Sequence, residues 1–282
     1  MKEYYVFLGS FGSGKSELAI NLALQKATGN PPCTLVDVDV INPYFRSSER
    51  GDLLRQSGVR LISPPYALQK IEIMSLSPEV YSAFAQPDGT VIFDAGGDPV
   101  GAVSLGQYHS HFQNIPSDQL SVFMVINPFR PLAETAEKAR ALMEQIQIAS
   151  RLKITGLINN PNLVNETTIQ ELNYGYEIVK ELSEITGIPV FGTAGMRHVL
   201  DDFASLAQTS GLNPDYIGRW MPIDMTMHRT WDKFLKEGLE KGRNAYDQSY
   251  RQRRSMQRRS PPASVAPSSI PCPPRARAFP SL

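Results

Sequence analysis

The sequence predicts an α/β protein in which a parallel β-sheet carries helices on both faces. Short apolar runs alternate with longer stretches of helical periodicity, as in chains built from strand–helix–strand units with right-handed crossovers. Most of the runs contain no polar alternation, which is typical of parallel strands covered on both faces. With 282 residues and 41% hydrophobic content, the chain can bury the core that such a sheet requires.

The individual elements follow from these patterns. Strands are expected at residues 4–8, 34–36, 59–62, 91–93, 122–126, 154–158 and 188–191. Helices are expected between them at residues 15–28, 49–57, 78–85, 132–151 and 166–186. After residue 191 the strand pattern ends, and further helices are expected at residues 201–209 and 228–250.

These elements predict a single domain over residues 1–250 that ends in a helical extension. Helix 228–250 is amphipathic, with Trp231 and Leu235 on its apolar stripe, which favours packing on the edge of the domain. Docking of a partner or of a membrane surface is the alternative for this helix. Residues 251–282 hold seven prolines and seven arginines but no acidic residue, so we expect a disordered Arg/Pro-rich tail and assign it no function.

The distribution of charge argues against nucleic acid as the main substrate. The chain has 28 basic and 28 acidic residues. Because seven of the basic residues lie beyond Tyr250, residues 1–250 carry 21 basic and 28 acidic groups and are acidic overall. Binding to phosphate backbones requires clustered Lys and Arg, which this part of the chain does not offer.

Cysteine usage and hydropathy indicate a reducing cytoplasm. Cys33 and Cys272 are too few for a disulfide framework, and the four histidines show no metal-ligand spacing with them. We therefore expect no structural metal ion apart from Mg²⁺. No apolar run approaches the roughly 20 residues of a membrane span, and the amino terminus lacks the pattern of a signal peptide.

A phosphate-binding loop is the strongest motif. The segment GSFGSGKS fits G-x-x-x-x-G-K-[ST] and lies between a predicted strand and a predicted helix, which is the context that the motif requires. Lys15 is expected to bridge the β- and γ-phosphates, and the Ser16 hydroxyl to ligate Mg²⁺. The residues expected to surround the phosphates are Gly9, Ser10, Phe11, Gly12, Ser13, Gly14, Lys15 and Ser16.

A second motif, D-x-x-G, is formed by Asp94 and Gly97 at the end of an apolar strand. The Asp94 carboxylate is placed to hold the hydration shell of Mg²⁺ opposite Ser16. Gly97 can offer its N–H to the γ-phosphate, so this motif would sense whether that phosphate is present. On its own the pattern is also a common turn, but it gains weight from the phosphate loop that precedes it.

Two further carboxylates, Asp37 and Asp39, follow a strand two residues apart. Their spacing points both toward the crevice where open α/β sheets bind ligands. We favour Asp37 for the metal and Asp39 for orienting or deprotonating the attacking water, with the reverse order as an alternative. A strand-terminal pair that merely caps the following loop is the structural alternative.

Asn159, Asn160 and Asn162 follow a later strand and are candidates for reading the base. Guanine-specific sites of this kind usually present N-K-x-D, but here Asn160 and Asn162 occupy the lysine and acid positions. An amide offers one donor and one acceptor, which suits the adenine edge and favours ATP over GTP. Asparagines beside proline are also ordinary turn formers.

The order of these motifs resembles the CobQ/CobB/MinD/ParA nucleotide-binding family of P-loop NTPases over about residues 3–210. The resemblance implies a three-layer α/β/α sandwich with a mainly parallel, roughly seven-stranded sheet, and nucleotide-dependent dimerisation. Ser10 stands where many members carry a second lysine that reaches the partner's phosphates. An ATP-sandwich homodimer would therefore need Arg46 or Arg130 to supply the charge. Local salt bridges are the favoured interpretation of both arginines.

The leading functional hypothesis is an Mg-dependent ATPase switch for an unidentified protein partner. Lys15, Asp39 and Asp94 would be catalytic, and Ser16, Asp37 and Asp94 would serve the metal. ATP would order residues 37–46 and 94–106, and hydrolysis to ADP would release them. A small-molecule kinase is the alternative, disfavoured because residues 98–116 contain no Lys or Arg for a lid. A non-catalytic adaptor is disfavoured by the intact Ser16, Asp39 and Asp94.

Overall fold

The computed structural model describes residues 2–29, 32–39, 47–63, 78–97, 99–163 and 166–227. These residues belong to one compact unit, Met1–His228. Several predictions fall outside the described residues: most of the first switch segment with Arg46, the helix at 228–250, the domain boundary at residue 250 and the tail.

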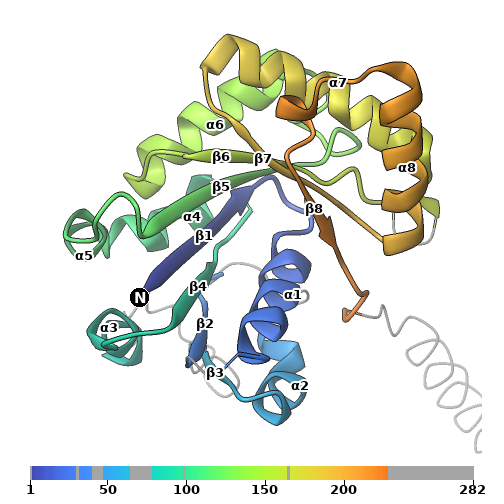
Figure 1. Cartoon of the computed structure of the whole chain (residues 1–282). Coiled ribbons are helices and arrows are strands. Elements are labelled where there is room, and N and C mark those ends of the chain that lie inside the picture. The colour runs from blue at the N-terminus through green and yellow to red at the C-terminus, as the bar shows by residue number, and fades with distance from the viewer. Residues whose placement is uncertain are drawn as a thin grey trace, which may run out of the picture. The chain divides into compact units, whose positions relative to one another are not determined.

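The centre of the described unit is an eight-stranded sheet whose strand pairs are all parallel (Figure 1). The spatial order is β3-β2-β4-β1-β5-β6-β7-β8. The strands are β1 (Glu3–Gly9), β2 (Cys33–Asp37), β3 (Val59–Ile62), β4 (Thr90–Asp94), β5 (Leu120–Ile126), β6 (Gly156–Asn159), β7 (Val190–Gly195) and β8 (Arg219–Pro222). The predicted α/β class with a parallel sheet is confirmed.

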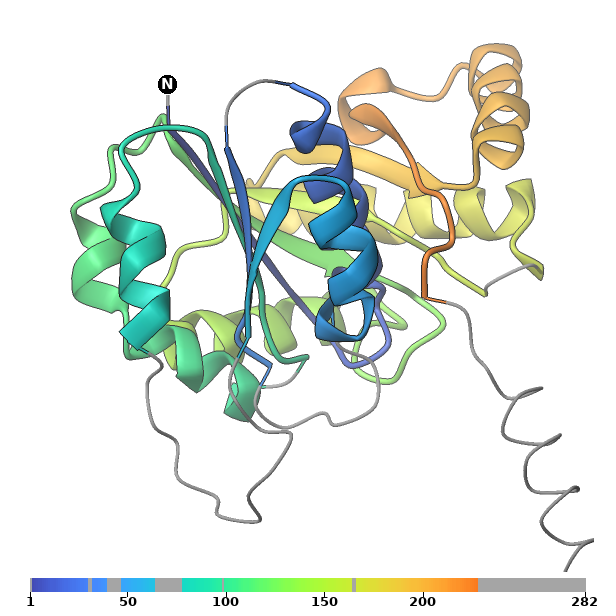
Figure 2. The same ribbon diagram turned by 90° about the horizontal axis from the view of Figure 1, so that it is seen from below.

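Helices cover both faces of the sheet and form a three-layer arrangement (Figure 2). Short 3-10 turns lie at η1 (Ser47–Arg50) and η3 (Pro214–Tyr216). One face carries α1 (Lys15–Ala27) and α2 (Gly51–Gln56). The other face carries α3 (Pro78–Ala85), α4 (Pro99–Gly106), α5 (His109–Gln113), α6 (Ala136–Ser150) and α7 (Ile169–Thr186). Helix α8 (Arg197–Ser210) packs against α7 in a third apolar cluster.

Strand β1 shows why the buried strands contain no polar alternation. Val6 and Leu8 point into the core beneath α6, whereas Phe7 between them points into the core beneath α1. All three side chains are fully buried. Since successive residues of a strand face opposite sides, both positions must be apolar when helices cover both faces.

From β1 the chain proceeds to β2 and β3 at one edge of the sheet, returns through β4 and continues to β5 on the other side of β1, so that β1 lies between strands whose connections run to opposite edges. Such a switch point opens a crevice beyond the carboxyl ends of the strands. In β4 the last residue, Asp94, is in register with Phe7 of β1 and Asp37 of β2. The strand ends that bear the predicted site residues are therefore neighbours.

Several elements differ from the sequence prediction, among them the short helix α5, which was not predicted, and β7, which continues to Gly195. Strand β8 adds an eighth strand to the roughly seven expected; it pairs with β7 and is mostly exposed, so it lacks an apolar run. Helix α4 occupies most of the predicted second switch segment. Its glycines disfavour a helix, but Gly106 lets α4 approach α6 closely, since a Cβ there would lie 2.7 Å from the carbonyl oxygen of Ala149.

Candidate functional site

The predicted phosphate loop joins the carboxyl end of β1 to the first turn of α1. Its glycines are required by space as well as by backbone angle. Gly9 has φ 142°, and a Cβ there would lie 2.4 Å from the carbonyl oxygen of Val125. Gly14, with φ 92°, caps α1, and a Cβ there would lie 2.3 Å from Asn160 Nδ2. Glycine alone therefore fits these two positions without displacing the neighbouring loops.

Side chains from two neighbouring loops hold the carbonyl groups of the phosphate loop. The carbonyl oxygen of Gly12 accepts hydrogen bonds from Arg130 Nε at 3.1 Å and from Asn127 Nδ2 at 3.5 Å. The carbonyl oxygen of Ser13 accepts one from Asn160 Nδ2 at 2.7 Å. Because the protein itself satisfies these acceptors, the loop is fixed in shape before any anion binds.

Lys15 is almost fully buried, with 6% of its surface exposed, and its Nζ donates to the carbonyl oxygen of Ser10 at 3.0 Å. Gly97 lies against this part of the loop. A Cβ on Gly97 would lie 2.7 Å from both the N and the Cα of Phe11, and 2.8 Å from Lys15 Nζ. The structure thus brings Gly97 of the D-x-x-G motif next to the lysine of the phosphate loop.

Three buried carboxylates complete the site. Asp37 and Asp94 end neighbouring strands in register, and the backbone N–H of Asp39 donates to Asp37 Oδ1 at 3.2 Å. The Asp39 side chain also approaches the second motif, since a Cβ on Gly96 would lie 3.3 Å from Asp39 Oδ1. The two acids predicted after β2 and the acid predicted after β4 therefore form one cluster.

Burial raises the pKa of Asp94 to about 7, and the negative charge of Asp37 adds to this effect. Ser16 and the Lys15 ammonium act in the opposite direction, and Asp39 contributes a smaller increase in the pKa. Neither carboxylate oxygen of Asp94 has a hydrogen-bond partner among the described residues. A cation bound beside Asp94 would offset the cost of burying its negative charge.

Unsatisfied buried groups gather at this site. Seven buried side-chain polar atoms have no partner within the described part of the chain, and four of them belong to Ser10, Ser13 and Asp94. Buried polar groups in native proteins are nearly always hydrogen-bonded, so a cluster of unsatisfied ones indicates a ligand. The two hydroxyls fit phosphate oxygens, and Asp94 beside Ser16 fits hydrated Mg²⁺.

The three asparagines after β6 are directed to different neighbours. The Nδ2 of Asn159 donates to the carbonyl oxygen of Leu172 in α7 at 3.3 Å, so this side chain ties β6 to a helix. Asn160 contacts the phosphate loop, as described above. Asn162 borders a small pocket whose other lining residues are Asn160, Pro161, Thr167, Ala194, Gly195, Met196, Ile223 and Met225.

Asn127 was missed as a candidate by the sequence analysis, and Arg130 was given a different contact. Asn127 is fully buried at the end of β5, and its Nδ2 also donates to the backbone oxygen of Asn162 at 3.1 Å. A polar residue directly after an apolar strand was the available signal. Arg130 was expected to form a local salt bridge. In the described residues it forms none and contacts the carbonyl oxygen of Gly12 instead.

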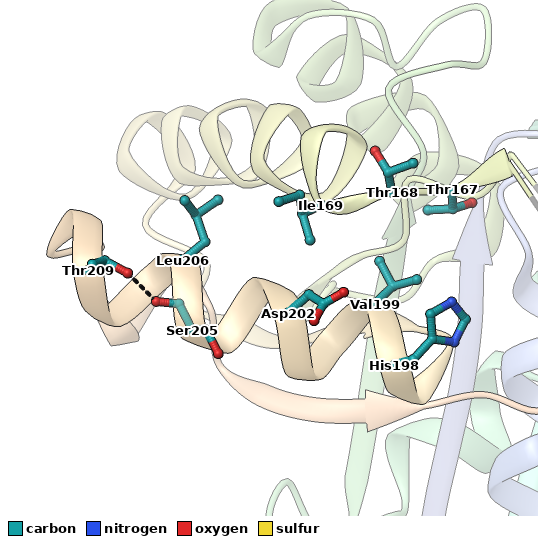
Figure 3. A pocket seen from close by; sticks show the side chains of 9 residues that line it. All are labelled: Thr167, Thr168, Ile169, His198, Val199, Asp202, Ser205, Leu206 and Thr209. Carbon is teal, nitrogen blue, oxygen red and sulfur yellow. Dashed lines mark hydrogen bonds between the residues drawn. The ribbon is translucent and has the colours of Figure 1, made fainter.

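A separate cavity of about 500 Å³ lies between the start of α7 and the exposed side of α8 (Figure 3). His198 and Asp202 of α8 line one side, and Thr167 and Thr168 line the other. Thr167 also borders the pocket at Asn162. None of the residues that line this larger cavity belongs to the phosphate loop, so we do not include the cavity in the candidate site.

No group of three or more His, Cys, Asp or Glu is arranged to hold a metal ion in the described parts of the chain. Mg²⁺ does not require such a group, because it keeps several water ligands and binds substrate phosphates. None of the described helices combines the length and the apolarity that crossing a bilayer demands.

Comparisons with known proteins found matches among solved structures alone. No protein-family model matches the chain, and no curated protein does. Among solved structures, it is similar to the cell division protein FtsY of Thermotoga maritima (17% identity, 69% of this chain, 62% of that chain, TM-score 0.46). FtsY of Elizabethkingia anophelis in complex with GDP is also similar (16% identity, 69% and 57%, TM-score 0.45).

A nucleotide-binding protein of Archaeoglobus fulgidus in complex with ADP is a third match (16% identity, 76% of this chain, 90% of that chain, TM-score 0.42). The chain spans about three-fifths of the FtsY structures. What the structure itself shows is a parallel α/β fold with the G-x-x-x-x-G-K-S loop between β1 and α1. Membership of the CobQ/CobB/MinD/ParA family stays a prediction.

Proposed function

We propose that this protein binds ATP with Mg²⁺, hydrolyses it slowly and uses the nucleotide state to control its affinity for a protein partner. The observation that carries the proposal is the cluster of unsatisfied buried groups around Lys15, with Ser10, Ser13 and Asp94 as its members. The phosphate loop alone would support nucleotide binding. Hydrolysis also requires groups that hold Mg²⁺ and orient water, and the carboxylates beside the loop can supply them.

Each residue of the cluster has a role in this proposal. Lys15 leaves the Ser10 carbonyl and binds the β- and γ-phosphates, and Ser16 and Asp94 hold Mg²⁺, with Asp37 on the metal side. When bound, Mg²⁺ neutralises phosphate charge. Asp39 accepts a hydrogen bond from the attacking water and orients it toward the γ-phosphorus.

Control of a partner follows from the position of Gly97. Its backbone touches the loop at Phe11 and lies beside Lys15, so a γ-phosphate at Lys15 would contact the Gly97 N–H. Helix α4 begins two residues later, and movement of Gly97 would therefore move the start of this helix. A nucleotide that contacts the two states differently shifts their populations, which is the requirement for a switch.

The choice of ATP over GTP rests mainly on Asn162, because the amide of Asn160 donates to the phosphate loop. Asn162 borders the pocket beyond β6 and β7, which has the position expected for the base, next to the phosphate loop. We further propose a CobQ/CobB/MinD/ParA-type protein in which a nucleotide-dependent homodimer could form. The acidic charge of residues 1–250 argues against nucleic acid as the partner.

The first test is the affinity for Mg·ATP in the parent chain and in Lys15→Ala, measured by isothermal titration. Loss of the buried cation should weaken binding by about 100-fold or more, because a charged hydrogen-bond donor to two phosphates disappears. Lys153→Ala, which removes an exposed lysine, is the matched control and should bind as the parent does. Binding within a few-fold of the parent in Lys15→Ala would exclude this loop as the site.

The second test addresses the partner. The hydrolysis-deficient Asp39→Asn chain, loaded with ATP or with ADP, is used to capture proteins from a lysate of the source cells. A switch should retain at least one protein in one nucleotide state and release it in the other. Light scattering of the same samples reports the assembly state of the chain. If the ATP-loaded and ADP-loaded chains captured the same proteins and scattered light equally, the switch would be contradicted and a kinase favoured.

A further inference from the structure

Arg130 lies flat against the tip of the phosphate loop. Its Nε donates to the carbonyl oxygen of Gly12 at 3.1 Å, and a Cβ on Gly12 would lie 3.0 Å from this Nε and 3.4 Å from Cζ. A guanidinium carries five N–H donors in a fixed fork, and the bond to Gly12 uses one of them. Within the described residues no carboxylate forms an ion pair with Arg130.

Arg130 and Gly97 meet the tip of the phosphate loop from opposite flanks of β1, since Arg130 follows β5 and Gly97 follows β4. Gly97, the residue placed to sense the γ-phosphate, packs on the backbone of Phe11. Gly12 is the next residue of the chain and is the one that Arg130 touches. Gly97 and Arg130 therefore reach adjacent residues of the loop tip from two different segments.

The electrostatics of the site call for a second cation there. Lys15 acts electrostatically on Asp94, which is clustered with the buried Asp37 and Asp39, and a triphosphate adds further negative charge. No lysine stands at Ser10, and residues 98–116 contain no Lys or Arg. A guanidinium is suited to this task because its planar fork matches phosphate oxygens in a bidentate manner.

The backbone around Arg130 is held in place, so the side chain alone has to move. The N–H of Arg130 donates to the carbonyl oxygen of Asn127, and the N–H of Ala133 donates to the carbonyl oxygen of Arg130. Two residues after Arg130, Leu132 has φ 72° although it is not glycine and is exposed. Unfavourable backbone angles of this kind persist where the surrounding structure imposes them, and they cluster at functional sites.

From these observations we propose that Arg130 is a γ-phosphate ligand that acts within its own chain and exchanges the Gly12 carbonyl for phosphate oxygens when a triphosphate binds. The inference rests on the proposed nucleotide-binding function and deepens it. It assigns to Arg130 the discrimination between ATP and ADP. It also removes the need for a lysine at position 10 donated by a second copy of the chain.

The test compares the affinities for Mg·ATP and Mg·ADP by isothermal titration in the full chain. Arg130→Ala should weaken Mg·ATP binding by about tenfold or more, since charge-assisted hydrogen bonds to the γ-phosphate are lost, and leave Mg·ADP binding within about threefold. Arg130→Lys keeps the positive charge but not the planar guanidinium, so its affinity for Mg·ATP should lie between those of the parent and Arg130→Ala. Arg140→Ala, which removes a surface arginine paired with Glu144 on α6, is the control and should match the parent.

Asn127→Ala separates this role from a merely structural one. Asn127 also donates to the Gly12 carbonyl but carries no charge, so its loss should weaken ATP and ADP binding equally. The proposal would be overturned if Arg130→Ala lost affinity equally for Mg·ATP and Mg·ADP, or lost affinity for neither. Failure of the parent chain to bind any nucleotide would instead overturn the proposed function, and this inference with it.

Mixing two impaired variants, at an ATP concentration that does not saturate Arg130→Ala, tests whether Arg130 acts within its own chain. Lys15→Ala and Arg130→Ala chains are combined, and ATP hydrolysis is measured against each chain alone. An arginine that reaches across a dimer would restore activity, because one of the two sites would regain both groups. We expect no restoration, and recovery of activity would refute action in cis.

Discussion

Asn160 donates a hydrogen bond from Nδ2 to the carbonyl oxygen of Ser13 at 2.7 Å, and this contact joins the loop after β6 to the phosphate loop. Both residues are almost fully buried. The amide of Asn160 therefore helps to shape the phosphate loop. Of the two asparagines predicted to read the base, Asn162 is the one that borders the pocket without this tie to Ser13.

Asn162→Asp is expected to shift the base preference from adenine toward guanine. A carboxylate accepts both hydrogens of the guanine edge, whereas an amide offers one donor and one acceptor. The measurement is competition between ATP and GTP at equal concentration, with a preference change of about tenfold expected. Asn160→Ala is the comparison variant. It should weaken the binding of ATP and GTP equally, because Asn160 contacts the phosphate loop. A parent chain that prefers GTP would contradict the adenine hypothesis.

Asp39→Asn is expected to lower ATP hydrolysis by about 100-fold or more while ATP binding survives. The amide keeps the shape of the side chain but removes the negative acceptor that orients water. Single-turnover hydrolysis and equilibrium binding, measured on the same preparation, separate the two effects. Unchanged hydrolysis would clear Asp39 of this role and transfer it to Asp37, which is then tested by Asp37→Asn.

Gly97→Ala is expected to abolish the ability of the chain to distinguish ATP from ADP. The new methyl group would lie 2.7 Å from backbone atoms of Phe11, and these cannot yield as a flexible side chain could. The second motif should then be displaced from the phosphate loop. Limited proteolysis in each nucleotide reports the change. Gly51→Ala at the start of α2 serves as the control, because its new methyl group would meet only side-chain atoms, the nearest at 3.4 Å.

The stability of the nucleotide-free protein should fall as the pH rises through the titration of Asp94. Its pKa is raised from 3.8 to about 7, mainly by burial, so the unfolded chain releases this proton at lower pH than the folded chain does. Between about pH 4 and pH 7 the folded state binds more protons, and stability therefore decreases across this window. Above about pH 7 Asp94 is ionised in both states, so it causes no further decrease in stability.

Asp94→Asn should flatten this dependence, because the amide carries no charge to bury. At pH 7.5 without Mg²⁺ or nucleotide, the Tm of the variant should exceed that of the parent by about 3 °C or more. The stabilisation by Mg·ATP should be lost from the variant at the same time. Thermal unfolding from pH 5 to pH 8 is the measurement, with the exposed Asp88→Asn as control. Equal slopes for the parent and Asp94→Asn would refute the assignment.

Much of the fold could be predicted from the sequence because its elements are apolar on every buried face. Strands β1 to β7 are apolar runs at whose ends polar or glycine residues appear, and α1, α3, α6 and α7 show clear helical periodicity. Elements that depend on their neighbours were not predictable in this way. Strand β8 forms by pairing with the edge strand β7. Helix α4 forms although its glycines disfavour a helix, and it packs closely against α6 at Gly106.

The sequence by itself determined the chemistry of the candidate site, since the phosphate loop, the D-x-x-G motif and the paired carboxylates are local patterns. Which long-range partners these groups meet was decided by the tertiary structure. Gly97 touches Phe11, and Arg130 touches Gly12, across 86 and 118 residues of chain respectively. Contacts between residues so far apart depend on strand order and loop shape, and no spacing within a single segment encodes them.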